Sequence, residues 1–248
     1  MSLQKFFAQH NRIALAFSGG VDSAYLLYAG IQAGCDVHAY YVKSAFQPQF
    51  ELDDAKKLAK ELGVKMTVLE LDVLSDLLIT SNPANRCYHC KKKIFRTIVD
   101  AAKADGYEVL IDGTNASDDS ADRPGMKALV ELSVLSPLRI CGITKDQVRS
   151  LSKEAGLFTW NKPAYACLAT RIKTGDGITK DKLHATEMSE KALSDLGFSD
   201  FRIRLSGSDA KIQVREEQLC KLLSHRKEIL EKLQPYYSAV TVDLEVRS

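Results

Sequence analysis

The stretch Ile13-Ala-Leu-Ala-Phe-Ser-Gly-Gly-Val-Asp-Ser23 decides the fold of this chain. Its five apolar residues, 13–17, predict a buried strand, and the Ser-Gly-Gly segment after them leads into a helix that begins near Asp22. A strand that ends in this way places backbone N–H groups, hydroxyls and the positive end of a helix at the carboxyl edge of a sheet. Glycines allow the backbone to close on an anion. The stretch therefore predicts a phosphate-binding loop.

Composition and charge limit the classes of protein to which the chain can belong. The 248 residues are 45% hydrophobic, which is enough for one large domain or for a medium domain with a small one. A formal net charge of +2 gives no overall field that would attract long nucleic acid or an anionic membrane. The N-terminal residues lack an apolar core with a cleavage site, and no apolar run approaches the ~20 residues of a membrane span. We therefore expect a cytoplasmic globular protein with no membrane partner.

Short β-rich segments alternate with helical periodicity over the first two thirds of the chain, which is typical of βα units on a parallel sheet. The expected strands cover residues 13–17, 37–42, 65–71, 108–112 and 134–136. The expected helices begin near Asp22, Gln49, Cys87 and Lys145, the last of them after a capping box at 144–147.

The pattern changes after about residue 175. The expected elements are then a helix over 180–196, strands over 201–205 and 211–214, a helix over 216–233 and a strand over 239–246. We therefore expect an α/β protein, with a parallel-sheet nucleotide-binding domain over 1–174 and a small α+β domain over 175–248.

The residues around the two glycines have the chemistry of a phosphate site. Ser18 and Ser23 add hydroxyl donors, and the carboxylate of Asp22 is a suitable ligand for Mg²⁺. The chain contains no Gly-Lys pair, which excludes a Walker A loop, and Gly-Gly-Val-Asp does not match the dinucleotide motif G-x-G-x-x-G. A second polar segment, Asp112-Gly-Thr-Asn-Ala-Ser-Asp118, follows the fourth expected strand at the same sheet edge. On spacing alone it is either part of the nucleotide site or a polar turn without that role.

Cys87 and Cys90 form a C-x-x-C motif among basic residues at the start of a helix. Positive neighbours and a helix N-terminus favour thiolates, which are nucleophiles and metal ligands. The chain has no second C-x-x-C motif, so structural cysteines remain the alternative. Cys167 lies in an irregular segment with charged residues on both sides, where we expect access to substrate. The other cysteines are expected to be inert buried thiols: Cys35, Cys141 and Cys220.

The stretch 18–23 resembles the pyrophosphate loop of the ATP pyrophosphatases, a family that includes GMP synthetase, NAD synthetase, asparagine synthetase and several tRNA-thiolating enzymes. The resemblance implies the adenine nucleotide alpha hydrolase-like fold. It also implies an adenylation assisted by Mg²⁺, in which pyrophosphate leaves from ATP. The ATP-binding residues that it implies are Ser18, Gly19, Gly20, Asp22, Ser23, Gly113 and Asn115.

Five motifs together resemble one subfamily, LarE. They are Ser-Gly-Gly-Val-Asp-Ser at 18–23, Arg-Cys-Tyr-His-Cys-Lys at 86–91, Asp-Gly-Thr-Asn at 112–115, Lys-Pro-Ala-Tyr-Ala-Cys-Leu-Ala-Thr-Arg at 162–171 and Phe-Arg-Ile-Arg at 201–204. This resemblance implies a sulfur transferase that adenylates a carboxylate of pyridinium-3,5-biscarboxylic acid mononucleotide and inserts sulfur to form a thiocarboxylate, for synthesis of the nickel-pincer cofactor. It assigns catalytic roles to Cys167, as the sulfur-bearing residue, and to Asp22.

Two sulfur chemistries occur in the family that the chain resembles. In some members the cysteine that matches Cys167 gives up its own sulfur, and in others three cysteines hold an iron–sulfur cluster that passes on sulfide from a donor. Because Cys87 and Cys90 accompany Cys167, we favour a [4Fe-4S] cluster, in which three thiolates leave the fourth iron open to bind the sulfide.

Three arginines fit the substrate end of such a site. Arg202 and Arg204 alternate along an expected strand and so share one face, and Arg171 ends the segment that contains Cys167. Guanidinium groups suit a phosphomonoester such as that of a mononucleotide. The alternative from the pattern alone is a solvated basic strand face.

Two other functions share some of these features. A tRNA-thiolating enzyme would have the same loop and a three-cysteine cluster, but it normally needs an added basic RNA-binding region, which the net charge does not indicate. A zinc or nucleotide sensor would use the three cysteines as structural ligands. We therefore expect a small-molecule substrate, a sulfide donor, a homo-oligomeric assembly and no nucleic-acid partner.

Overall fold

The computed structural model describes residues 1–118 and 124–247, which form two compact units. The N-terminal unit consists of Met1–Val73 and Asn85–Lys162, and the C-terminal unit of Leu74–Ala84 and Pro163–Ser248. This division differs from the boundary expected at residues 174 and 175. The main part of the C-terminal unit begins at Pro163, and the unit also includes residues 74–84 from the first half of the chain.

The sheet of the N-terminal unit has four parallel strands within the described residues, in the order β3, β2, β1, β4. Their bounds are Arg12–Ala16 for β1, Asp36–Lys43 for β2, Met66–Glu70 for β3 and Leu110–Ile111 for β4. The α/β fold with a parallel sheet is thus confirmed. The fifth expected strand is reduced to one parallel bridge between Ile111 and Leu135. Pro137, which starts a short helix and has no N–H to donate, prevents its extension.

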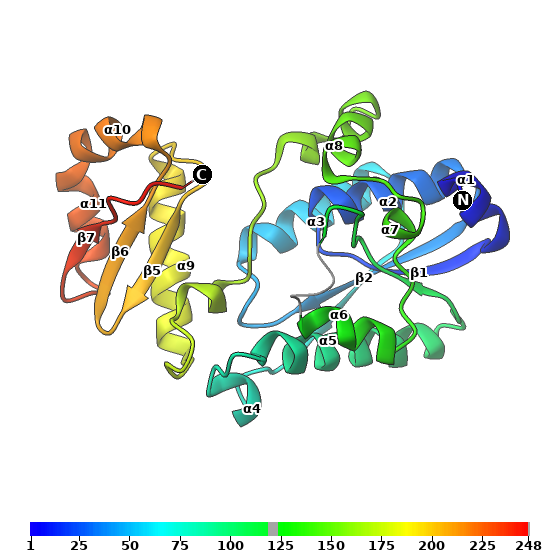
Figure 1. Ribbon diagram of the computed structural model, residues 1–248, viewed down its shortest axis with the longest axis horizontal. Coiled ribbons are helices and arrows are strands. Elements are labelled where there is room, and N and C mark those ends of the chain that lie inside the picture. The colour runs from blue at the N-terminus through cyan, green and yellow to red at the C-terminus, as the bar shows by residue number, and fades with distance from the viewer. Residues whose placement is uncertain (119–123, 248) are drawn as a thin grey trace. The chain divides into compact units, whose positions relative to one another are not determined.

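Helices cover both faces of this sheet (Figure 1). One face holds α1 (Leu3–Gln9), α2 (Val21–Gln32), α3 (Gln49–Glu61), α7 (Pro137–Ile140) and α8 (Lys145–Glu154), and the other holds α5 (Arg86–Ala104) and α6 (Pro124–Glu131). Alternation along β1 supplies both cores, because Ile13 and Leu15 pack into the first and Ala14 into the second. The capping box of Thr144 and Gln147 at the start of α8 is confirmed.

The C-terminal unit is a small α+β structure, as expected. Its sheet pairs β5 (Arg202–Ser206) antiparallel with β6 (Asp209–Gln213), and β6 parallel with β7 (Val240–Val242). The helices of this unit are α4 (Leu77–Thr80), α9 (Lys180–Asp195), α10 (Leu219–Ser224) and α11 (Arg226–Leu233). In the described ranges of either unit, no helix is both long and apolar enough to cross a membrane.

Asn82 attaches the segment 74–84 to the rest of the C-terminal unit. Its side chain is buried, and its Nδ2 donates to the carbonyls of Lys173 over 2.8 Å and of Asp176 over 3.1 Å. Its own carbonyl accepts from the N–H of Gly175 over 2.9 Å. The φ of +55° at Asn82 is one that asparagine tolerates better than most residues. Asn82 therefore helps to join two distant parts of the sequence, through both its side chain and its main chain.

Candidate active site

The loop between β1 and α2 is closed by its own serines. Ser18 Oγ lies 3.1 Å from Ser23 Oγ, and the N–H of Gly20 donates to Ser18 Oγ over 3.4 Å. Gly19 has a φ of +72°, and a Cβ on it would lie only 3.2 Å from the carbonyl oxygen of Glu51. Glycine is therefore required at this position for both conformation and space. Helix α2 begins at Val21, so its unpaired N–H groups and positive end open onto the loop.

The loops after β1 and β4 meet at the carboxyl edge of the sheet. The two strands are neighbours, but the chain leaves β1 through α2 on one face and β4 toward α6 on the other. This is the topological switch point, where open α/β sheets bind their ligands. Gly113 makes the closest approach, since a Cβ on it would lie 2.9 Å from the backbone nitrogen of Ser23. The structure thus brings both predicted ATP-binding segments together.

Both carboxylate oxygens of Asp22 have partners. Oδ1 accepts a hydrogen bond from Asn115 Nδ2 over 3.1 Å, and Oδ2 forms an ion pair with the ammonium group of Lys145. The sequence analysis did not include Lys145 among the site residues, although it is the first residue of α8 and directly follows Thr144, the N-cap of the predicted capping box. A helix that starts after a parallel strand begins at the carboxyl edge of the sheet, and that rule would have placed Lys145 near the site.

Asp112 stabilises the loop after β4 through hydrogen bonds. It is only 6% exposed and accepts hydrogen bonds from Ser136 Oγ over 2.6 Å and from Thr114 Oγ1 over 2.5 Å. Burial raises the pKa of Asp112, although the two hydroxyl donors act in the opposite direction. The side chain thereby fixes the backbone on either side of Gly113.

Cys87 and Cys90 lie one turn apart at the start of α5 and face the same side of that helix. The thiol of Cys87 is exposed, with Arg86 Nη2 at 3.6 Å from its sulfur, whereas Cys90 is buried. Cys167 belongs to the C-terminal unit, where it caps the 3₁₀ helix η2 (Leu168–Arg171). Among residues 1–118 and 124–247, no three His, Cys, Asp or Glu side chains are grouped as a metal site.

The remaining cysteines differ in burial. Cys35 and Cys141 are partly buried, and burial raises the pKa of both thiols. Cys220 is exposed on α10, so the expectation that it is buried was wrong. Its short helix turns this residue toward solvent while Leu222 packs inward.

Arg171 and Glu190 form a buried ion pair in the C-terminal unit. Their side chains are 1% and 5% exposed, and two hydrogen bonds join them, Nε to Oε1 over 2.8 Å and Nη2 to Oε2 over 3.0 Å. Burial alone would lower the pKa of Arg171, but the hydrogen bond and charge of Glu190 outweigh it and raise that pKa. The sequence analysis missed Glu190, whose signal was a carboxylate on the buried stripe of α9 between Leu183 and Leu193.

The same pair holds the segment that contains Cys167. Arg171 Nη1 donates to the carbonyl of Ala166 over 2.9 Å and to Thr170 Oγ1 over 2.8 Å. Glu190 Oε2 also accepts from the hydroxyl of Tyr165 over 2.5 Å. We expected Arg171 to contact substrate, and the structure instead gives its guanidinium group protein partners on both sides of Cys167.

Arg202 and Arg204 differ although they share one face of β5. Arg202 is buried and donates to the carbonyls of Ala164 and Phe201, each over 2.7 Å. Burial, followed by the charge of Arg171, lowers the pKa of Arg202 to about 10. Arg204 is exposed. Of the three predicted substrate arginines, Arg204 is therefore the one whose side chain is open to solvent.

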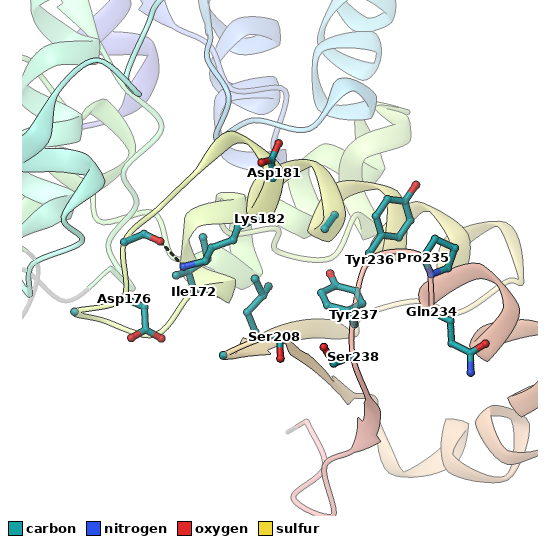
Figure 2. Close-up of a pocket in the computed structure, with 15 residues that line it drawn as sticks. Ile172, Asp176, Asp181, Lys182, Ser208, Gln234, Pro235, Tyr236, Tyr237 and Ser238 are labelled. Atoms are coloured by element: carbon teal, nitrogen blue, oxygen red, sulfur yellow. Dashed lines mark hydrogen bonds between the residues drawn. The ribbon is translucent and has the colours of Figure 1, made fainter.

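A concavity of about 900 Å³ lies elsewhere in the C-terminal unit (Figure 2). It is lined by the 172–177 loop, the first turns of α9, the β5–β6 turn and residues 234–238. Lys182 Nζ, at its wall, donates to the carbonyl of Gly177 over 2.7 Å (Figure 2). None of the predicted site residues lines it.

Comparisons with known proteins agree with the geometry of the loop. Residues 12–87 match the family described as Queuosine biosynthesis protein QueC. The chain is 28% identical to the tRNA-specific 2-thiouridylase MnmA of Pseudothermotoga lettingae, over 61% of this chain and 54% of that protein. It is also 34% identical to an uncharacterised Synechocystis protein, over 98% of this chain and 92% of that protein.

A further relative covers nearly the whole chain and has a named activity. It is the pyridinium-3,5-bisthiocarboxylic acid mononucleotide synthase of Lactiplantibacillus plantarum, which is 34% identical over 94% of this chain and 86% of its own length. A match over 94% of the chain covers most of both units described above. The chain therefore belongs to the LarE family of pyridinium-3,5-bisthiocarboxylic acid mononucleotide synthases.

Proposed function

We propose that this chain is an ATP-dependent sulfur transferase that adenylates a carboxylate of pyridinium-3,5-biscarboxylic acid mononucleotide and converts it to a thiocarboxylate. The observation that carries the proposal is the glycine and serine loop after β1, which meets Gly113 and Asn115 at the switch point of the sheet. Membership of the synthase family supports the choice of substrate.

The loop binds the β- and γ-phosphates of ATP. Backbone N–H groups at Gly19 and Gly20 and the hydroxyls of Ser18 and Ser23 donate to phosphate oxygens, and the N-terminus of α2 stabilises the pyrophosphate that leaves. A substrate carboxylate oxygen attacks the α-phosphorus, so one O–P bond forms while the bond to pyrophosphate breaks. The carboxylate of Asp22 is a hard oxygen ligand that fits Mg²⁺, which would offset the phosphate charge when bound.

The exposed guanidinium group of Arg204 contacts the phosphomonoester of the substrate. Arg171 and Arg202 act indirectly, because they donate hydrogen bonds to the carbonyls of Ala166 and Ala164 and so fix the backbone conformation of the segment that leads to Cys167. We therefore assign substrate binding to all three arginines, directly for Arg204 and through the shape of the segment for the other two.

Cys87, Cys90 and Cys167 hold a [4Fe-4S] cluster in this proposal. The donor chemistry fits, since all three side chains are thiols and the first two lie on one face of α5. Such a cluster would supply the transferable sulfide. Sulfide replaces AMP at the acyl carbon, so a C–S bond forms and the C–O bond to AMP breaks.

Product analysis tests the adenylation. With ATP, substrate and sulfide under anaerobic conditions, we expect AMP and pyrophosphate in equal amounts with thiocarboxylate, whereas ADP and phosphate would contradict it. Iron and labile sulfide in anaerobically purified protein test the cluster. A dehydroalanine at position 167 after one turnover, with activity retained in a Cys87→Ala, Cys90→Ala variant, would instead support a sacrificial cysteine.

The similarity to MnmA makes tRNA thiolation the second candidate. It is tested in the same assay by adding unmodified tRNA in place of the mononucleotide. Sulfur incorporation into tRNA would favour this candidate, and incorporation only into the pyridinium nucleotide would reject it.

A further inference from the structure

The sheet of the C-terminal unit places two positive charges directly opposite each other. Arg204 of β5 and Lys211 of β6 are register partners in the antiparallel pair. Their neighbours Ile203 and Ile212 are buried in the core, whereas Arg204 is exposed and the Lys211 side chain is 43% exposed. Like charges at directly opposite positions destabilise a sheet. The stability of the fold therefore does not explain why both positions carry a cation.

The carboxylate of Asp243 holds Lys211 in place. Lys211 Nζ lies 2.9 Å from Asp243 Oδ2, and Asp243 Oδ1 accepts a hydrogen bond from the N–H of Glu245 over 3.3 Å. The hydrogen bond from Lys211 lowers the pKa of Asp243, and the charge of Arg204 acts in the same direction. One carboxylate thus faces two cations, which leaves one positive charge of the pair without compensation by Asp243.

The same face of the sheet borders the segment that leads to Cys167. Arg202 lies two residues before Arg204 on β5, and its guanidinium group donates to the carbonyl of Ala164 over 2.7 Å. Ala164 and Cys167 belong to one irregular segment of the C-terminal unit. An anion bound at Arg204 and Lys211 would therefore lie on the face that this segment adjoins.

We propose that Lys211 is a further substrate-binding residue, which acts together with Arg204 on the phosphomonoester of the mononucleotide. A phosphomonoester carries close to two negative charges at pH 7, because its second pKa is about 6. Arg204 supplies one positive charge, and Lys211 supplies the other from the opposite position on the neighbouring strand. The pair thereby selects a mononucleotide over a nucleoside, which lacks the phosphate. This proposal rests on the substrate proposed above.

Competition between Asp243 and the phosphate for one ammonium group distinguishes this role from a structural one. If Lys211 binds the phosphate, loss of its charge weakens binding, whereas loss of the Asp243 charge does not. If the ion pair only holds β6 and β7 in place, both changes weaken binding, because either one disturbs the sheet.

Calorimetric titration of the full chain without ATP tests the role of Lys211. The ligands are pyridinium-3,5-biscarboxylic acid mononucleotide and the corresponding nucleoside. For Lys211→Met we expect the affinity for the mononucleotide to fall about tenfold or more, from the loss of a charge-assisted hydrogen bond, and the affinity for the nucleoside to stay unchanged. Lys211→Arg keeps the charge and should retain most of the affinity. For Asp243→Asn we expect the mononucleotide to bind at least as tightly as it does to the wild type.

Lys191→Met is the matched control, because it also removes an ammonium group from an ion pair of the C-terminal unit, the exposed pair with Asp195 on α9. Wild-type affinity for the mononucleotide in Lys211→Met, or a loss of affinity in both Lys211→Met and Asp243→Asn, would overturn the role of Lys211 and leave the substrate assignment standing. Wild-type protein that binds no mononucleotide would overturn both. Circular dichroism spectra that match the wild type confirm that the variants are folded.

Discussion

The substitution Glu190→Gln should lower the stability of the C-terminal unit more than the loss of any exposed ion pair would. In Glu190→Gln the guanidinium group of Arg171 stays in place with 1% exposure and loses its counter-ion. Breaking a buried pair by removing one partner costs about 3–5 kcal/mol, because the remaining charge is uncompensated. The amide also offers two hydrogens where Glu190 accepts from Arg171, Tyr165 and the N–H of Ile203.

A urea titration measures the effect. With an m-value of about 2 kcal/mol/M, a loss of about 4 kcal/mol lowers the midpoint by about 2 M. Circular dichroism follows both units, whereas fluorescence of Trp160, the only tryptophan of the chain, follows the N-terminal unit. We expect the midpoint to shift in the circular dichroism transition, which includes the C-terminal unit, and to stay unchanged in the Trp160 fluorescence.

Asp195→Asn on the same helix is the control. Asp195 pairs with Lys191, and the two side chains are 59% and 61% exposed, so its loss should change stability by about 0.5 kcal/mol or less. If the urea midpoint of Glu190→Gln fell no further than that of Asp195→Asn, the reasoning would be refuted. Such a result would mean that water reaches Arg171 in the folded protein.

Three further results are expected. Gly19→Ala should weaken pyrophosphate binding in calorimetry and should lower the free energy of unfolding more than Gly207→Ala does. Gly207 has a φ of +63° but no neighbour within 4 Å, so alanine there should cost only the backbone strain of about 1–2 kcal/mol. Equal losses of stability in the two variants would contradict the close contact at Gly19. Burial lowers the pKa of His38, so as the pH falls the imidazole is protonated in the unfolded chain before it is protonated in the folded one, and the free energy of unfolding should fall below about pH 6.5. His38→Gln should reduce this dependence of stability on pH, as measured by denaturation at several pH values. An unchanged pH dependence in the variant would count against the role of His38. Cys87→Ser should abolish iron binding in a metal assay while Cys220→Ser leaves it unchanged, and iron retained by Cys87→Ser would exclude that ligand.

Local signals were sufficient for much of the fold. The apolar run before Ser18 predicted β1, and the hydroxyl and amide of Thr144 and Gln147 predicted the start of α8, because each depends on neighbours in the sequence. The strand expected over 134–136 is a single bridge in the structure, because Pro137 has no N–H to donate to the sheet and starts a helix instead.

Contacts over long sequence distances were the part that the sequence could not supply. The loop and Gly113 could be placed at one sheet edge from strand order alone, but the partner of Asp22 required knowing where the first turn of α8 lies. In the same way, alternation predicted that Arg202 and Arg204 share a face, whereas only the packing reveals that the first is buried. Periodicity specifies a direction for a side chain and leaves its partner undetermined.

The attachment of residues 74–84 by Asn82 has a consequence for anyone who wishes to dissect this protein. The chain passes between the two units at 73/74, at 84/85 and at 162/163. A gene truncated after codon 162 would therefore encode the nucleotide-binding unit together with an orphan piece of the other, whose Asn82 amide has lost the carbonyls of Lys173 and Asp176. The complementary fragment from 163 onward would lack the same piece. Clean separation requires excision of 74–84 with a short linker in its place, and transplantation of that peptide to the second fragment.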